Sequence, residues 1–253
     1  MLRFINNILP KPDYRVIFSR LGYRQKETEL AESSRKEIVA WIDETASLVN
    51  LKGVMLESNF EVADQDKILI YPAASQAAPS EKIEIKGITC KARAKRPQGR
   101  ALRDPLFPHS LGHERASTSR HSLHSEIISS SLCKFISGAN KILLMGITCG
   151  KEIADFIEKE QKENMTKAVV LDAAAGEIAD RGLDYIMSLY SKELIRKSEK
   201  LFSKRFSPGY GDLSLETQKI FYNLLEMKKI EVNITESFLL IPQKSVIALT
   251  GIV

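Results

Sequence analysis

The stretch RFSPGYGD, Arg205 to Asp212, places a cation, a rigid turn, an aromatic ring and an acid within eight residues. Arg205 has the side chain best suited to a two-pronged grip on a carboxylate. Pro208-Gly209 predicts a turn whose backbone can approach a ligand closely, because glycine has no Cβ. Tyr210 adds a ring face and a hydroxyl group. An amino-acid-like ligand with an aromatic group would use all of these features. A loop that only ends a helix and carries a surface arginine explains the octapeptide equally well.

The other side chains that could do chemistry point to no particular reaction. The chain contains no G-x-S-x-G, H-E-x-x-H or P-loop motif, and its three cysteines form no C-x-x-C pair. All of its histidines, the usual general bases, fall within one irregular segment. They are His109, His113, His121 and His124. A solvated basic loop explains these histidines better than a metal site does, so we predict no catalytic residue and no metal ligand.

The basic character of the chain comes from residues 91–124. This segment has eight Lys and Arg residues and two acids, whereas the rest of the chain has 29 basic and 30 acidic residues. It lacks Ile and Val and has no helical or strand period, so we expect an irregular insertion that buries no core. Its cations could contact the phosphates of a nucleic acid, but a single Phe offers little for base stacking. Nucleic-acid binding is therefore the weaker interpretation.

Helical and strand periods in the remainder come in separate runs, which favours an α+β fold over a doubly wound sheet. We expect helices at 14–21, 27–50, 125–138, 151–163, 165–201 and 215–228, the last of them capped by Asp212 or Ser214. We expect strands at 54–62, 67–71, 82–89, 141–148, 231–236, 237–242 and 244–253.

Length and composition are those of an ordinary globular protein, with 253 residues of which 43% are hydrophobic and 27% charged. No apolar run reaches the roughly 18 residues needed to span a bilayer. The N-terminal stretch MLRFINNILPKPD is followed by nothing that looks like a signal-peptidase site. We therefore expect a cytoplasmic protein with no membrane partner.

The C-terminal half resembles the activation (reactivation) domain of cobalamin-dependent methionine synthase. RFSPGYGD is similar to that family's R-x-x-P-G-Y motif, and NITESFLLIPQKSV is similar to its T-E-S segment followed by P-x-x-S-V, in matching order and spacing. KILLMGITCG and VVLDAAAGEIADRGLDYI resemble the strand and helices that precede the motif. The resemblance is good over 126–253 and loose over 1–88, and it is to the short, stand-alone form of the domain.

The resemblance implies one domain over residues 1–253, interrupted at 91–124, with a bent, mainly antiparallel sheet flanked by helices. The family binds S-adenosylmethionine and supplies its methyl group to an oxidised cobalamin held by a partner, while an electron donor such as flavodoxin or ferredoxin reduces the cobalt. The reduced cobalt is the nucleophile, so such a domain needs no catalytic base and serves to position the methyl donor. The implied partner is a corrinoid-binding methionine synthase or methyltransferase subunit, and the implied activity is part of a methyltransferase system.

The resemblance also implies where the ligand would bind. Arg205 matches the motif arginine that would hold the ligand carboxylate. Ser207, Gly209 and Tyr210 match positions that contact the ligand through backbone and ring. Asp180 stands where the family usually has Glu, and an acid there would pair with the α-amino group or the sulfonium charge.

The remaining implied positions are less direct. Because Asp180 has a shorter reach than Glu, Glu177 is the alternative acid. Glu236 and Ser237 match the T-E-S segment, which could shape the sheet beside the site. A further tyrosine that longer family members supply to the site has no counterpart in this sequence.

Three interpretations of function stay open at the level of sequence. The first is a protein that binds S-adenosylmethionine and supports reductive methylation of a corrinoid methyltransferase. The second is a regulator or chaperone of a corrinoid protein that has the same fold and no methyl transfer. The third is a nucleic-acid-associated protein acting through residues 91–124. This segment has no counterpart in the family, and its composition fits either an insertion or a stretch of altered reading frame.

Overall fold

The computed structural model describes residues 2–9, 11–24, 29–71 and 124–253. These residues belong to one structural unit, 1–76 with 123–253, while the second unit, 77–122, lies outside the described residues. The strand predicted at 82–89 and all of the predicted insertion except His124 therefore lie outside them as well.

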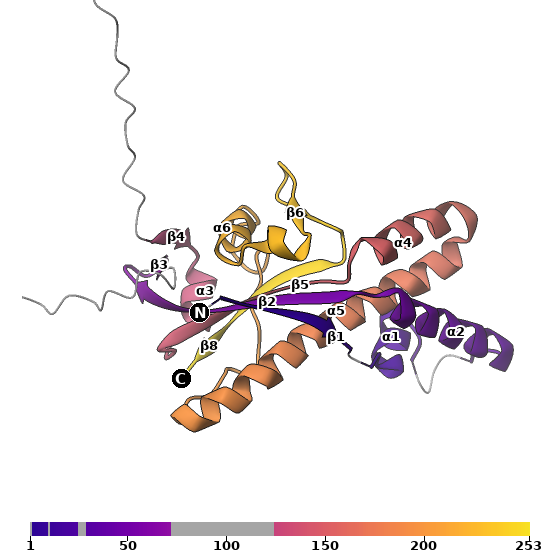
Figure 1. The fold of residues 1–253 in the computed structure, drawn as a ribbon, viewed down its shortest axis with the longest axis horizontal. Coiled ribbons are helices and arrows are strands. Elements are labelled where there is room, and N and C mark those ends of the chain that lie inside the picture. Colours follow the sequence, from indigo (N-terminus) through magenta and orange to yellow (C-terminus); the bar gives the residue numbers. More distant parts are fainter. Residues whose placement is uncertain (1, 10, 25–28, 72–123) are drawn as a thin grey trace, which may run out of the picture. The chain divides into compact units, whose positions relative to one another are not determined.

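Six of the described strands form one antiparallel sheet (Figure 1). They are β1 (Leu2–Ile8), β2 (Leu51–Val62), β3 (Lys67–Tyr71), β4 (Ser125–Ile128), β5 (Lys141–Thr148) and β8 (Ser245–Ile252). Their order is β4-β3-β2-β5-β8, and β1 pairs with the first half of β2. The long β2 thus joins both parts of the sheet, because its second half pairs with β3.

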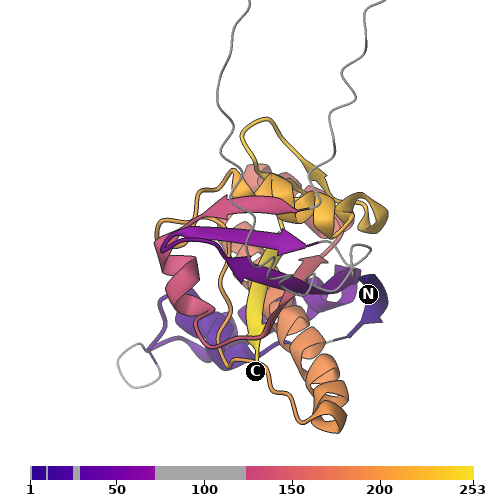
Figure 2. The same ribbon diagram turned by 90° about the vertical axis from the view of Figure 1, so that its left-hand side faces the viewer.

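Helices flank this sheet on both faces (Figures 1 and 2). The helices of the described residues are α1 (Tyr14–Arg20), α2 (Glu32–Leu48), α3 (Ser130–Phe135), α4 (Lys151–Glu163), α5 (Met165–Leu194) and α6 (Thr217–Leu224). Helix α5 packs on one face of the sheet and α3 and α6 on the other, while α1 and α2 pack on α5. A curled antiparallel sheet between helices is the α+β architecture that the sequence predicted, and this prediction is confirmed.

Strand β5 explains how two cores share one sheet. Its side chains alternate between the faces, so Leu143, Met145 and Ile147 pack in the cluster that contains α5. Ile142 and Leu144 pack on the opposite face, in the cluster that contains α6. Both sets are almost completely buried, as the continuous apolar sequence KILLMGIT predicts for a central strand. Each such side chain stabilises the fold by roughly 1.5–3 kcal/mol.

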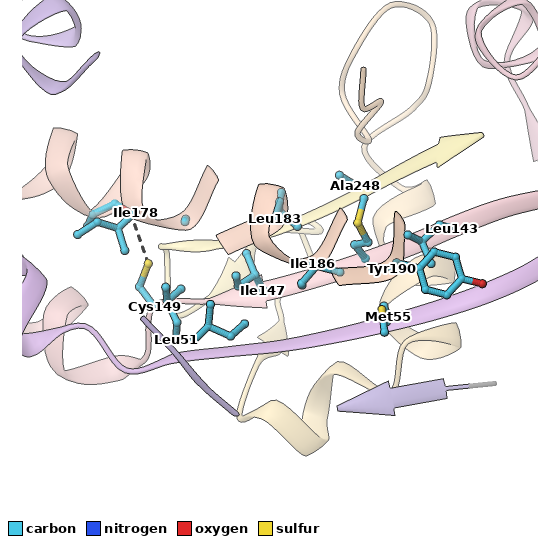
Figure 3. Packing of buried hydrophobic residues seen from close by; sticks show 14 of the residues in the cluster. Leu51, Met55, Leu143, Ile147, Cys149, Ile178, Leu183, Ile186, Tyr190 and Ala248 are labelled. Atoms are coloured by element: carbon cyan, nitrogen blue, oxygen red, sulfur yellow. Dashed lines mark hydrogen bonds between the residues drawn. The ribbon is translucent and has the colours of Figure 1, made fainter. Parts of the chain in front are cut away.

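Helix α5 covers one face of the sheet (Figure 3). Ile178, Leu183 and Ile186 lie at helical spacing and are buried against the strands. Gly182 allows the close approach, because a Cβ there would lie 2.1 Å from Cδ1 of Ile147. Cys149 is buried beside the helix and its Sγ donates to the Ala175 carbonyl oxygen at 3.4 Å. Burial raises the pKa of this thiol to about 12, so it is unreactive at neutral pH.

Helices α1 and α2 pack against the N-terminal half of α5. Ile17, Ile38 and Ile42 of the two helices meet Val170 and Ala174 of α5 in a separate buried cluster. The α1 start agrees with the sequence: Asp13 accepts hydrogen bonds from the backbone amides at positions 15 and 16, as an N-cap should. This packing holds the end of α1 beside α5.

The helix predicted at 125–138 is wrong in its first part. Residues 125–128 form β4, which pairs with β3, and α3 starts only after Ser129, whose hydroxyl caps it. The strand β1 was not predicted, because its sequence LRFINNI has no strand period and its pairing with β2 is long-range.

Other predicted elements are shorter than expected. Helix α5 ends at Leu194, followed by a 3-10 turn at Ile195–Lys197 and a left-handed residue, Ser198. The chain then turns back along β8, where Lys200 and Val253 exchange backbone hydrogen bonds. The two strands predicted at 231–242 are reduced to a two-stranded ribbon, β6 (Asn233–Ile234) and β7 (Leu240–Ile241).

In the part of the chain that the structure describes, none of the helices combines the length and the apolar character needed to cross a membrane.

Candidate functional site

The stretch from Arg205 to Asp212 forms a loop attached to the last strand of the sheet. Its first half is tied to β8, since the backbone amide and carbonyl groups of Phe206 and Leu249 exchange hydrogen bonds of 2.9 and 2.8 Å. The predicted turn follows. Gly209 has a φ of +89°, a conformation that other residues rarely adopt, and its amide donates to the Leu213 carbonyl oxygen at 2.9 Å. The glycine is therefore required by the turn itself.

The side chain of Arg205 lies against α5 rather than pointing into solvent. Its Nη1 donates to Oδ1 of Asp184 and lies 3.8 Å from Sδ of Met187. Its Nη2 is 3.8 Å from Oδ1 of Asp180. Asp180 and Asp184 are four residues apart on a helix, so both carboxylates face the same way. The arginine side chain is only 23% exposed, because these contacts hold it against α5.

A second arginine, Arg20 at the end of α1, reaches the same helix face. Its Nη2 is 3.0 Å from Oε2 of Glu177 and 2.6 Å from Oδ2 of Asp180. Sequence reasoning missed this residue, because 157 positions separate it from Glu177 and no motif marks it. We call Glu177, Asp180 and Asp184 the α5 acid row. The structure thus brings together three of the predicted site residues, Arg205, Asp180 and Glu177.

The acids of this row differ in their surroundings. Glu177 is almost buried, and this burial raises the pKa of its carboxyl even though the nearby Arg20 lowers it. The side chains of Asp180 and Asp184 are 41% and 61% exposed. Three carboxylates here face the guanidinium groups of Arg20 and Arg205. Arg181, whose charge also acts on Glu177, is 4.0 Å from Asp13, so the local balance is one negative charge. Such a surface can accept a cation at the two aspartates, and Arg205 can hold a carboxylate that displaces Asp184.

Of the other predicted site residues, some share the loop of Arg205 and one lies elsewhere in the fold. Ser207 and Tyr210 belong to the same loop as Arg205. Tyr210 is 66% exposed as a whole residue, and the centroid of its ring lies 6.4 Å from that of Phe206. Glu236 is exposed in the turn between β6 and β7. Among the contacts of the described residues, none joins Glu236 to Arg205 or to the α5 acid row.

Two surface cavities occur in the described residues, and the second is lined by Ser130, a hydrogen-bond partner of Asp212. One is lined by Tyr222, Asn223, Glu226, Lys228 and Lys229. The other is lined by Asp64, Gln65, Asp66, Ser130 and Lys134. Neither contains Arg205 or Tyr210.

The end of the loop corrects a prediction. Asp212 does not cap α6 but binds the start of α3, where Oδ2 accepts from the Ser130 amide at 2.9 Å and from its hydroxyl at 2.7 Å. Its Oδ1 accepts from the Ser129 hydroxyl at 2.5 Å and the Ser131 amide at 3.0 Å. These hydrogen bonds hold the pKa of Asp212 well below its usual range. The hydroxyl of Ser214, the other predicted cap, accepts from the Glu216 amide at 3.3 Å in the turn that leads into α6, which begins at Thr217.

Comparison of the sequence with protein-family models and with curated proteins finds no match. Among solved structures, the chain is similar to one described as the crystal structure of the MetH reactivation domain bound to AdoHcy. The TM-score is 0.61 at 14% sequence identity, and the match covers 99% of this chain and 78% of the other. At this identity the similarity shows the fold, and the fold is the one that the motif resemblance implied.

Proposed function

We propose that this protein binds S-adenosylmethionine between the loop Arg205–Tyr210 and the α5 acid row, and that it supports reductive methylation of a cobalamin carried by a corrinoid methyltransferase. The observation that carries the proposal is the position of Arg205, which lies in its R-x-x-P-G-Y loop directly against Asp180 and Asp184. The shared fold adds support, because the solved MetH reactivation domain holds AdoHcy, which is S-adenosylmethionine without its transferable methyl group.

The residues present fit the charges of this ligand. S-adenosylmethionine has one carboxylate and two cationic centres, the α-ammonium and the sulfonium. Arg205 offers a guanidinium to the carboxylate, which would take the place of Asp184. Asp180 and the released Asp184 would then face the two cations, and the unbalanced negative charge of this surface favours a ligand with a net positive charge.

The rest of the loop would bind the nucleoside. Tyr210 exposes a ring on which a purine can stack, and Gly209 leaves the backbone uncovered beside it. The sulfonium supplies an activated methyl group, and the task of these residues is to hold it in one orientation. In this proposal no residue of the site needs to remove a proton, because the reduced cobalt of the partner is the nucleophile.

Two measurements test the proposal. Calorimetry should show S-adenosylmethionine binding to the purified protein, with AdoHcy binding more weakly because it lacks the sulfonium charge. Absence of heat with either compound would overturn the proposal. The second measurement follows methyl transfer from labelled S-adenosylmethionine to an inactive Co(II) methionine synthase without its own activation domain, with flavodoxin or ferredoxin as reductant. Binding without transfer would favour the regulator or chaperone of the same fold.

Nucleic-acid binding through residues 91–124 stays a prediction, since these residues lie outside the described ones apart from His124.

A further inference from the structure

The loop that carries Arg205 is held at both ends. At its start, Phe206 is hydrogen-bonded to β8 through its backbone. At its end, the Asp212 carboxylate accepts four hydrogen bonds from three consecutive serines of a segment 81 to 83 residues away in sequence. The positive-φ turn at Gly209 lies between these two attachments. Its conformation is therefore determined jointly by the sheet and by α3.

The contact with α3 is close as well as polar. Gly211 lies against Ser131, and a Cβ at Gly211 would be 2.7 Å from the serine hydroxyl oxygen. Leu213, two residues after Gly211, is buried, and its backbone closes the turn. Its carbonyl oxygen accepts from the Gly209 amide at 2.9 Å, and its amide donates to the Tyr210 carbonyl oxygen at 3.0 Å. The side chain of Asp212 thus fixes the position of the adjacent Leu213, whose backbone is hydrogen-bonded to Gly209.

We propose that Asp212 is a positioning residue of the ligand site. Its hydrogen bonds attach the loop to α3 and keep Gly209 and Tyr210 in the conformation that binds the ligand. This inference rests on the proposed function for the nature of the ligand. Asp212 acts through the loop, since all four of its hydrogen bonds go to Ser129, Ser130 and Ser131.

A carboxylate is needed at this position because both of its oxygens accept from two donors each. An asparagine would keep one oxygen and present an amide N–H group to two donors, which leaves those groups without an acceptor. The change preserves size and shape, and Asp212 lies on the surface, so Asp212→Asn should still fold. Ser130→Ala is a milder variant, because it removes one hydroxyl donor and keeps the backbone amide.

The test combines hydrogen exchange of the free protein with calorimetry. In Asp212→Asn, the amides of Gly209 and Leu213 should exchange faster, while those of Phe206 and Leu249 keep their protection. Affinity for S-adenosylmethionine should fall by about tenfold or more, since charge-assisted hydrogen bonds are lost. Ser130→Ala should give smaller changes of the same kind. Glu216→Gln, an equal loss of charge at an exposed position on the same segment, should change neither quantity.

The outcomes separate the inference from the proposed function. Unchanged affinity in Asp212→Asn, with a wild type that binds, would overturn the inference and leave the function intact. So would faster exchange spread over the whole sheet, because it would show a general loss of stability. A wild type that binds neither S-adenosylmethionine nor AdoHcy would overturn the proposed function. The exchange measurement needs no ligand and would still decide whether Asp212 holds the loop.

Discussion

At the scale of single residues, the charged side chains of the proposed site are paired with one another. Arg205 is paired with Asp184, and Arg20 with Glu177 and Asp180. These pairs keep the guanidinium groups directed at α5, but they also mean that a ligand must compete for Arg205. The Asp184 partner of Arg205 is 61% exposed, and ion pairs that water reaches contribute little stability, so this competition would cost little.

Replacing Arg205 tests the residue most directly. Arg205→Ala should weaken S-adenosylmethionine binding by about 1.5–3 kcal/mol, the usual range for a charge-assisted hydrogen bond. Arg205→Lys should recover only part of this, because one ammonium cannot make both hydrogen bonds to a carboxylate. Calorimetry measures both. Lys204→Ala, the neighbouring exposed cation, is the matched control. An unaltered dissociation constant in Arg205→Ala would remove the residue from the site.

Glu177 predicts a dependence of stability on pH. Burial raises the pKa of its carboxyl above the ordinary 4.5, against the effect of Arg20, with the charges of Asp180 and Arg181 also acting on it. An acid whose pKa is raised by folding stabilises the fold at low pH and loses that contribution as the pH rises through the folded-state pKa. Glu177→Gln removes this titration. The free energy of unfolding of the wild type, measured in urea relative to the variant, should therefore decrease from pH 4 to pH 7. A constant difference across this range would contradict the prediction.

At the scale of elements, α5 matters most because it joins the core to the site. One of its faces packs on the sheet through Ile178, Leu183 and Ile186, and another carries the α5 acid row. Because both faces belong to one rigid helix, the depth at which the apolar face packs also sets the position of the acids relative to Arg205.

Two glycines of α5 test this packing. Gly182 faces Ile147 with no room for a side chain, so Gly182→Val should destabilise the protein by about 1–3 kcal/mol through overpacking. Gly176 is the matched control six residues earlier. A Cβ there meets only Nη1 of Arg20, at an ordinary 3.5 Å, so Gly176→Ala should stabilise the helix by about 0.5–1 kcal/mol. Thermal and urea unfolding measure both, and equal effects at the two glycines would contradict the packing argument.

At the scale of the whole molecule, the charge is unevenly distributed. Residues 91–124 carry eight basic and two acidic side chains, and the remainder is close to neutral. The composition predicts that this segment is no part of the core or of the ligand site. The unit formed by residues 1–76 and 123–253 contains every helix and strand of the described residues, including those that bear the site.

Excision tests the segment. Replacing residues 91–124 by a short Gly/Ser linker should leave the melting temperature and the affinity for S-adenosylmethionine nearly unchanged, because long loops cost little to close. The product would have 29 basic and 30 acidic residues, so any salt-sensitive binding to nucleic acid should disappear. A fall of many degrees in melting temperature would show that the segment packs on the fold.

The sequence by itself determined what depends on neighbours along the chain. The Asp13 cap, the helix at 151–163, the central strand at 141–148 and the turn at Gly209 follow from periodicity, capping and backbone freedom, and the structure confirms them. The fold class followed from the grouping of the elements and from two motifs in order. The family resemblance pointed to Arg205 through the R-x-x-P-G-Y motif and to Asp180, with Glu177 as the alternative, through GEIADRGLDYI. The structure places these three residues together, and their role in binding stays a prediction.

Only the tertiary structure decided the pairings that are distant in sequence. The strands β1 and β4 exist because β2 and β3 offer them partners. Arg20 reaches Glu177 across 157 positions. Asp212 was one of two residues expected to cap the helix that follows, the other being Ser214, yet it binds serines 81 to 83 positions earlier. A carboxylate can bind the amides at the start of any helix, so local preference does not decide between α3 and α6. The packing of the loop against α3 selects α3, and this long-range contact leaves no pattern in the sequence.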